Sequence, residues 1–329
     1  MDTDRLEDLA DRYRRFAEQE AHGRSPLYQE LARGVAGDRE LLRLIAELPE
    51  PKQQPNLILA AVRYLGGDPD GWGQFREWAR DRWDDVVEVV HARRTQTNEP
   101  ARCATLLPLL ATLPQPLALL EVGASAGLCL LPDHYAYEYG GHRVEPTRFV
   151  GAPAPVFCCR ASASTPLPER GVDVVWRAGL DLAPVDVHDH DQVAWLETLV
   201  WPGQTRRLDR LRAAIQVARL DPPPLTQGDL RYDLPALAAQ APADATLVVF
   251  HTAVLAYVDD FGERMAFADT VAGLDAVWIA NEDPGLFEFR PGRREPWPMG
   301  RLLMTRDRQP VAWNDGHGAD TEWLSSTEA

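Results

Sequence analysis

The sequence predicts an α/β protein in which a helical N-terminal region precedes a mainly parallel sheet of seven strands. Two observations support this fold class. Apolar residues recur at helical spacing through the first 115 residues. From residue 116 on, short apolar runs alternate with helical stretches, and this alternation is typical of right-handed crossovers that build a parallel sheet. We therefore expect a helical region or cap at residues 1–115 and an α/β domain at residues 116–329.

The helical region shows apolar faces at a spacing of three and four residues. One such face consists of Leu41, Leu44, Ile45 and Leu48. The Gly-Gly-Asp-Pro segment at residues 66–69 interrupts the pattern with turn chemistry. Because no strand-rich segment stands out here, we expect the first strand of the sheet only after residue 115.

Seven strands are predicted after the helical region. The first, at residues 117–122, is an apolar run bounded by turn signals, as in a buried parallel strand. The others are expected at residues 172–176, 225–227, 246–250, 276–280, 301–305 and 310–313, the last two as a hairpin around Asp307 and Arg308. Helices are expected at residues 196–219, 234–240 and 262–271. Residues 139–170, rich in Pro, Gly and Arg, are predicted to be an insertion with one strand at residues 156–160.

Composition and charge argue against several classes of partner. The net charge of −16 repels nucleic acid on average, so we expect none as a partner. The four cysteines form no C-x-x-C pair, and we expect no metal site and reduced thiols. The N-terminus lacks the apolar core of a signal peptide and no run of about 18 apolar residues occurs, so we expect a cytoplasmic protein without a membrane span. The sequence does not indicate an oligomeric state.

The candidate chemistry is carried by a glycine loop after the first strand. Glu121 lies near the end of this strand, and the loop contains Gly123, Ala124, Ser125 and Gly127. Glycine lets the backbone approach a ligand closely, and a helix predicted to follow would present unpaired N–H groups. The pattern is typical of the cofactor loop of methyltransferases that use S-adenosylmethionine. That cofactor has no pyrophosphate and needs no third glycine, so we expect these five residues to bind it.

Two other interpretations of the loop stay open. In the first, Gly-x-Ser-x-Gly is the nucleophile elbow of a serine hydrolase, with Ser125 as nucleophile, Asp283 as acid and His317 as base. In the second, the loop is a tight strand-to-helix turn without a ligand. A separate alternative concerns the whole fold, which could be a degenerate methyltransferase that serves as a non-catalytic binding or partner module. A hydrolase elbow usually follows several strands and an H-G-G-G motif, and neither precedes this loop. The cofactor interpretation is therefore favoured.

Acidic residues follow the next two predicted strands. Asp181 lies in a Gly-x-Asp-x-x-Pro turn like the one with which many methyltransferases hold the ribose of the cofactor. A carboxylate suits this task because it accepts two hydrogen bonds at once. Asp229, followed by Leu230, ends the next strand, where an acid accepts from the adenine amino group. Either acid could instead cap a turn or helix.

The remaining candidate residues are expected to face the substrate. Ligands of open α/β sheets bind at the carboxyl ends of the strands. His251 and Glu282 follow the fourth and fifth strands, and either could remove a proton from a nucleophile. The residues predicted to line the substrate pocket are Gln96, Asn98, Glu99, Arg102, Tyr257 and Asn281. The polar stretch around Asn98 could instead simply begin the next helix.

Several stretches of the chain resemble one bacterial family, catalogued as a domain of unknown function with the number 2332. They are QPNLILAAVRYL, RRTQTNEPARCATLLPLLA, LLEVGASAGLCLLPDHYAYEYG, WRAGLDLAPVDV, VVFHTAVLAYV, VWIANEDP and AWNDGHGADTEWL. The resemblance covers nearly the whole chain, with Cys129 where the signature usually has Asn. It implies a Rossmann-like, methyltransferase-type sheet and brings no substrate with it. The expected function is methyl transfer from S-adenosylmethionine to a small molecule.

Overall fold

The structure, a computed structural model, describes residues 3–96, 98–151, 153–286, 298 and 300–324. The chain divides into two compact units. Met1–Thr97 and His190–Asp209 form one, here called the helical unit, and Asn98–Asp189 and Arg210–Ala329 form the other, the α/β unit. The division precedes the expected boundary at residue 115, because Arg102 and Ala104 already hydrogen-bond with strands of the α/β unit.

The helical unit is built from amphipathic helices around one apolar core. Its α-helices are α1 (Thr3–Arg15), α2 (Pro26–Gly37), α3 (Arg39–Ala46), α4 (Pro55–Tyr64), α5 (Trp72–Asp81), α6 (Trp83–Ala92) and α8 (His190–Thr198). A π-helical turn at Phe16–Ala21 and a 3-10 turn at Glu50–Lys52 join some of them. Ser25 and Asp38 cap α2 and α3 by accepting hydrogen bonds from first-turn N–H groups. Trp195 of α8 lies in the same core, which explains why this late segment belongs to the unit.

The single helix expected at residues 196–219 is two helices. α8 ends at Thr198, and α9 (Thr205–Leu220) contains the boundary between the two units. Pro202 and Gly203 lie between them, and Gly203 has a φ of +86°. A proline lacks the N–H that a helix interior needs, and a residue at positive φ leaves the helical conformation. The apolar spacing continues across the break, so periodicity alone predicted one helix.

The α/β unit contains a nine-stranded sheet in the order β5-β12-β11-β10-β9-β8-β1-β6-β7. Its parallel part consists of β1 (Leu117–Val122), β6 (Val174–Asp181), β7 (Leu225–Gln227), β8 (Thr246–Thr252) and β9 (Val277–Glu282). Counted along the chain, these five strands lie in the order 3-2-1-4-5. The direction of winding therefore reverses between β1 and β8.

The prediction of seven strands in this sheet is wrong, because two strands extend its edge. β10 (Arg301–Arg306) and β11 (Gln309–Asp315) form the expected hairpin, with Asp307 and Arg308 at positive φ in its turn. β12 (Asp320–Trp323) pairs with β11, and β5 (Arg160–Ala161) pairs with β12. Strands of four and two residues are too short for an alternating pattern to reveal them.

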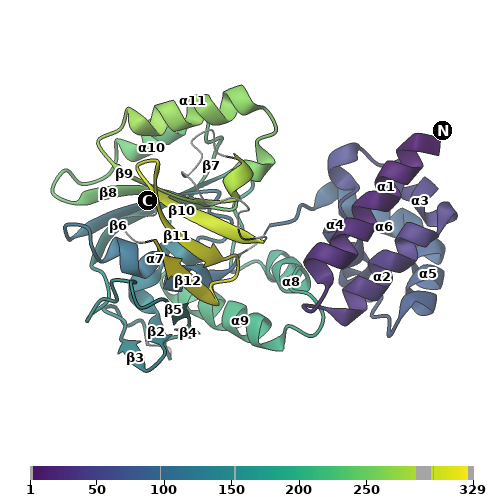
Figure 1. Cartoon of the computed structure of the whole chain (residues 1–329), viewed down its shortest axis with the longest axis horizontal. Helices are drawn as coiled ribbons and strands as arrows, with labels where there is room; N and C mark the ends of the chain where they lie inside the picture. Colours follow the sequence, from purple (N-terminus) through teal and green to yellow (C-terminus); the bar gives the residue numbers. More distant parts are fainter. Residues whose placement is uncertain (1–2, 97, 152, 287–297, 299, 325–329) are drawn as a thin grey trace. The chain divides into compact units, whose positions relative to one another are not determined.

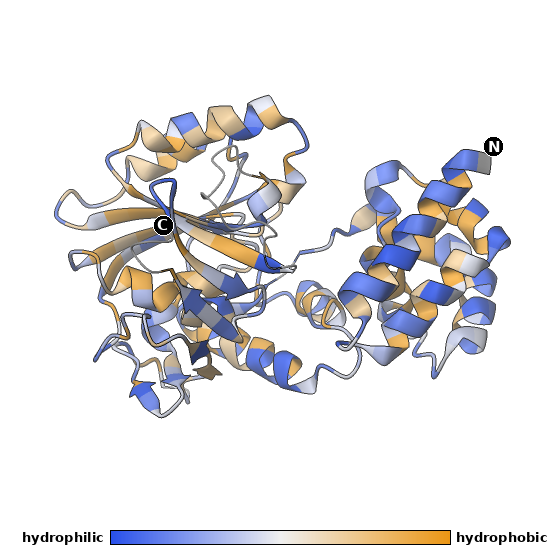
Figure 2. Cartoon of the chain, in the orientation of Figure 1, coloured by the Kyte–Doolittle hydropathy of each residue, from blue (hydrophilic) through white to orange (hydrophobic). Residues whose placement is uncertain are grey.

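Helices cover both faces of this sheet (Figure 1). α10 (Leu234–Ala238) and α11 (Phe261–Ala272) pack on one face, where Leu234, Phe267 and Val271 share a core with the strands. α7 (Cys103–Leu110), whose residues are all buried, lies on the opposite face. Figure 2 shows the hydrophobic colour of the central strands, as expected for parallel strands buried on both sides.

The predicted insertion at residues 139–170 overlaps a second, three-stranded sheet. Its strands are β2 (Ala136–Tyr139), β3 (His142–Val144) and β4 (Val156–Cys158), in the order β3-β2-β4. The single strand expected at residues 156–160 is divided between the two sheets. Cys159 N donates to Glu138 O of β2, whereas Arg160 N donates to Ala319 O beside β12, so the chain changes sheets between these two residues.

Three of the five parallel strands of the large sheet extend further toward their carboxyl ends than predicted. Gly179 was expected in a turn but lies in β6, paired with Glu121 of β1 and Leu225 of β7. A glycine fits there because a Cβ would lie 2.5 Å from the side chain of Leu225 and 2.7 Å from that of Ala124. β8 continues to Thr252 and β9 to Glu282. Residues that were predicted to follow the strands are therefore part of them.

Substitution of Arg177 tests an ion pair inside the α/β unit. Arg177 on β6 donates to both carboxylate oxygens of buried Asp133, at 3.1 and 2.8 Å. Arg177→Met should leave this carboxylate buried without its partner and lower the free energy of unfolding by about 3–5 kcal/mol in urea denaturation. Arg143→Met, which removes an exposed pair with Glu145, should change stability little. Equal losses in the two variants would contradict this assignment.

Candidate functional site

The candidate site lies in the α/β unit at the carboxyl ends of its parallel strands. Ligands of open α/β sheets bind where the direction of winding reverses, which in this sheet is between β1 and β8. The loops after these two strands meet there, since the side chain of Val254 lies against Gly123. The site is therefore described from the glycine loop, residues 123–127, outward.

The glycine loop uses its own N–H groups within the protein. Gly123 N and Ala124 N both donate to Leu180 O, and Gly127 N donates to Ala124 O. Ser125 N donates to Asp181 Oδ2 at 2.7 Å, and Ala126 N donates to Asn98 Oδ1 at 3.2 Å. All five N–H groups thus have partners, and the loop is not arranged to hold a phosphate.

The α-helix predicted after the glycine loop is replaced by two 3-10 turns, at Leu128–Leu130 and Pro132–His134. Pro132 has no N–H to continue a helix, and Tyr135, just before β2, already has an extended backbone. The expected set of unpaired N–H groups at a helix N-terminus is therefore not formed here.

Packing explains the two glycines of the loop. A Cβ on Gly123 would lie 2.4 Å from Val254, and one on Gly127 would lie 2.6 Å from Pro223. Gly123, Ser125 and Gly127 also have positive φ values of 71°, 50° and 68°, which glycine adopts without strain. Both glycines are required by the fold itself, whatever the loop binds.

Asp181 lies directly beside the glycine loop. Its Oδ2 accepts from Ser125 N, and its Oδ1 accepts from Ala183 N at 2.8 Å. The residue is only partly buried. Because each carboxylate oxygen has two lone pairs, each oxygen retains one acceptor position for a ligand.

Asp229 already has a cationic partner at its carboxylate. Arg231 donates to both of its oxygens and also pairs with Glu263 of α11. These hydrogen bonds from Arg231 lower the pKa of Asp229. Leu230, beside it, packs against the apolar core of the sheet. The adenine amino group was the predicted partner of Asp229, whereas its partner in the structure is the guanidinium of Arg231.

Glu121 is a buried acid with an unused oxygen. Its side chain is only 5% exposed, and its Oε2 has no hydrogen-bond partner among the described residues. Burial raises the pKa of Glu121 well above its usual range, and the nearby Cys129 and Asp181 raise it further while Arg102 opposes them. A cation placed beside this acid would favour its ionised form and so lower this pKa.

His251 and Glu282, the predicted proton acceptors, contact each other inside the protein. Both are fully buried, with His251 Nδ1 2.6 Å from Glu282 Oε1. Trp278 Nε1 donates to His251 Nε2 at 3.0 Å, so Nδ1 carries the proton of the neutral ring. Glu282 also accepts from the backbone N–H groups of Val254 and Leu255. Both ring nitrogens are occupied, and the pair fixes the loop after β8.

The predicted substrate residues lie in different surroundings. Asn98 donates to Ser125 Oγ, and buried Arg102 donates from Nη1 to Thr252 O and from Nε to Gly316 O, each at 2.9 Å. Gln96 belongs to the helical unit.

The two predicted substrate residues that come later in the chain, Tyr257 in a 3-10 turn after β8 and Asn281 on β9, also differ from each other. Asn281 is buried and accepts from Asn314 Nδ2 at 3.0 Å. Tyr257 is 59% exposed at the surface. Asn281 therefore lies beneath the edge of the sheet, whereas Tyr257 is accessible to a ligand.

Sequence reasoning missed the contact between Glu99 and the turn that joins β11 to β12. Glu99 is buried, with Oε2 3.8 Å from His317 Nδ1 and Oε1 3.6 Å from Arg210 Nη2. Gly318 lies so close to Ala101 that a Cβ would be 2.1 Å from its carbonyl oxygen. The glycines around His317 were the only local signal of this close approach.

The three residues of the hydrolase alternative each contact other groups. Ser125 Oγ accepts from Asn98, and His317 lies beside Glu99. Asp283 Oδ1 accepts from Gly285 N at 2.8 Å. The hydroxyl of Ser125 therefore hydrogen-bonds with the amide of Asn98, whereas a hydrolase would need an imidazole there.

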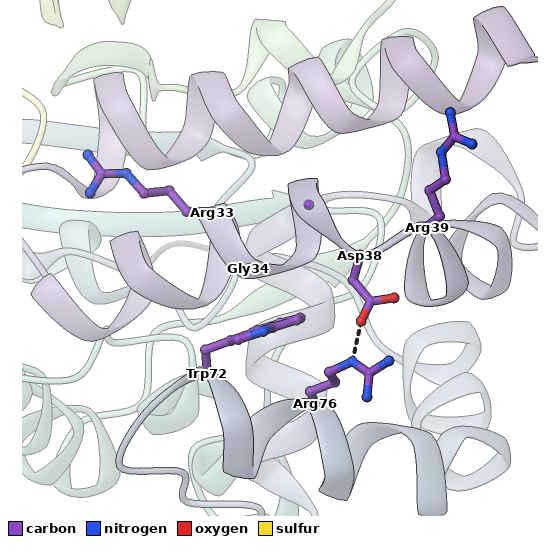
Figure 3. Close-up of a pocket in the computed structure, with 7 residues that line it drawn as sticks. Arg33, Gly34, Asp38, Arg39, Trp72 and Arg76 are labelled. Atoms are coloured by element: carbon purple, nitrogen blue, oxygen red, sulfur yellow. Dashed lines mark hydrogen bonds and ion pairs between the residues drawn. The ribbon is translucent and has the colours of Figure 1, made fainter.

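A shallow hollow of about 480 Å³ lies in the helical unit (Figure 3). It is lined by Arg33, Gly34, Gly37, Asp38, Arg39, Trp72 and Arg76. Arg76 pairs with Asp38, and Arg33 pairs with Glu18. Because two of its cations already have carboxylate partners, we place the candidate site in the α/β unit.

Two further properties concern only the part of the chain that the structure describes. Within it, no three His, Cys, Asp or Glu side chains gather as a metal ion would need. None of the described helices is long and apolar enough to span a membrane.

Comparison with known proteins gives one match. Neither the curated proteins nor the solved structures contain a significant match to the chain. A family model described as "Uncharacterized protein conserved in bacteria (DUF2332)" matches residues 10–323. This confirms the family expected from the sequence, and the chain therefore belongs to this bacterial family.

Proposed function

We propose that the α/β unit binds S-adenosylmethionine at the carboxyl ends of β1, β6 and β8 and transfers its methyl group to a small molecule. One observation carries this proposal. The site presents acceptors, at Asp181 and Glu121, while the N–H donors of the glycine loop are all used. Such a site suits a ligand that has many donors and positive charge. S-adenosylmethionine has ribose hydroxyls, an ammonium and a sulfonium, and it has no phosphate.

The strand order supports the same location. The order 3-2-1-4-5 places the crevice of an open sheet between β1 and β8, beside the glycine loop. Asp181 would accept from the ribose hydroxyls, and Glu121 would face the positively charged end of the cofactor. Leu230 would lie beside the adenine, near Asp229. The bound cofactor supplies a methyl group on a good leaving group.

The chain's own contribution is mainly positioning. His251 and Glu282 hold the backbone of Val254 and Leu255, and Val254 in turn covers Gly123. We assign this pair to fixing the loop rather than to taking a proton, because both nitrogens of His251 have partners. A reaction that needs no strong activation of its leaving group depends largely on such fixed geometry.

Substitution of Asp181 tests the cofactor site. Asp181→Ala should weaken binding of S-adenosylmethionine at least about tenfold in isothermal titration calorimetry, because it removes the charged acceptor for two hydroxyls. Asp181→Asn keeps an oxygen that can accept from Ser125 N–H, so the glycine loop should stay in place. The difference in affinity between the two variants shows how much of the loss in Asp181→Ala comes from a displaced loop. Asp173→Ala, near the opposite end of β6, should bind like the unchanged protein.

The outcome with the unchanged protein separates the alternatives. If folded protein gives no heat and no thermal shift with either S-adenosylmethionine or S-adenosylhomocysteine, the proposed function is wrong. Labelling by a fluorophosphonate probe that disappears in Ser125→Ala would instead support the hydrolase. Binding of both ligands without any methyl transfer would indicate a non-catalytic binding module.

Proton release tests the role of Glu121. Its pKa is raised in the free protein, and a cation beside it would lower that pKa, so binding should expel a proton. Affinity for S-adenosylmethionine should therefore rise with pH until Glu121 ionises in the free protein. Calorimetry in buffers of different ionisation enthalpy measures the release. Glu121→Gln should abolish it, and the same release in this variant would show that Glu121 does not face the cation.

A further inference from the structure

A second histidine–carboxylate pair at this edge of the sheet reaches solvent. His317 is 29% exposed at its side chain, and its Nδ1 lies 3.8 Å from Oε2 of the buried Glu99. The pair of His251 and Glu282, by contrast, is completely buried. A general base must meet the proton that it removes, and of the two histidines only His317 has this access.

The chain holds Glu99 next to the glycine loop. Asn98, the preceding residue, hydrogen-bonds with Ser125 Oγ and Ala126 N. The carbonyl oxygen of Glu99 itself accepts from Cys129 Sγ at 3.6 Å. These contacts place the His317–Glu99 pair beside the part of the loop where the proposed function puts the cofactor.

The backbone that carries His317 is held from several sides. Asp315 Oδ1 accepts from His317 N at 2.9 Å and from Ala319 N at 3.2 Å. Arg102 Nε donates to Gly316 O, and Gly318, at a φ of +76°, packs on the carbonyl of Ala101. A ring on such a fixed turn is oriented before any ligand arrives.

Charged groups of both signs surround the ring of His317. Glu99 faces His317 from one side, and Asp315 lies two residues before it in the same turn. Arg210 contacts the other oxygen of Glu99, and Arg102 contacts the neighbouring Gly316. The carboxylate of Glu99 is thus flanked by a guanidinium and an imidazole, so it can balance the charge that His317 gains with a proton.

We infer that His317 is the general base that takes the proton of the methyl acceptor, with Glu99 stabilising the resulting imidazolium. This inference rests on the proposed function and narrows the substrate to small molecules with an O–H or N–H nucleophile. The bond between acceptor and methyl carbon forms as the carbon–sulfur bond breaks. The electron pair of that bond leaves with sulfur, and the acceptor's proton goes to His317 Nε2 and then to solvent.

The pairing of His317 with Glu99 is tested without any ligand. NMR of the protein with ring-labelled histidine gives the pH at which His317 is half protonated, with His317→Asn identifying its signal. This pH should be lower in Glu99→Gln, because the neutral amide no longer stabilises the imidazolium. Glu263→Gln, which removes a carboxylate elsewhere in the same unit, should leave it unchanged. An unchanged value in folded Glu99→Gln would overturn the pairing.

The position of His317 beside the reacting group is tested with two ligands that differ by one charge. Saturating S-adenosylmethionine should make His317 harder to protonate than saturating S-adenosylhomocysteine does, because the sulfonium repels the imidazolium. If both ligands bind by calorimetry and His317 responds equally to them, the base assignment is wrong and the cofactor site stands. If neither ligand binds, the proposed function fails, whatever the result for Glu99→Gln.

Discussion

The carboxyl edge of the sheet depends on one buried cation, Arg102. Its guanidinium donates to the backbone oxygen and hydroxyl of Thr252 at the end of β8, and to the carbonyl of Gly316 in the β11–β12 turn. Carbonyl groups buried at strand ends without a donor are costly, and a planar guanidinium with five N–H donors can serve several of them at once. This arginine therefore joins two loops that are far apart in sequence.

The short segment around Arg102 extends this constraint to the whole site. Asn98 fixes the glycine loop, Glu99 meets His317, and Arg102 fixes the ends of β8 and β11. The 3-10 turn Pro100–Arg102 makes this possible, because it lets neighbouring side chains point to different loops. Glu99 also caps this turn by accepting from Ala101 N at 3.3 Å. One turn of helix thus sets the relative positions of three loops.

The sequence predicted the features that depend on local patterns. β1 and β7 occur at the predicted residues, and Asp181 lies beside the glycine loop. What the sequence could not show is how far each strand continues. β8 and β9 are extended by their mutual pairing, with His251 opposite Ala280 and Thr252 opposite Asn281. His251 thereby lies inside the sheet, as does Glu282, which pairs with Leu303 of β10, whereas the pattern had predicted that both residues follow the strands and face the substrate. The partners of Glu99 and Arg102 likewise come from distant segments that no local pattern connects.

The two histidines of the site differ in what surrounds their rings. Both ring nitrogens of His251 have partners, Glu282 at Nδ1 and Trp278 at Nε2, and the ring is fully buried. The side chain of His317 is 29% exposed and lies beside the buried Glu99. A group that takes a proton from a ligand must be able to contact that ligand. The geometry therefore favours the turn of His317, rather than the strand ends, as the place where a reaction at this edge would release its proton.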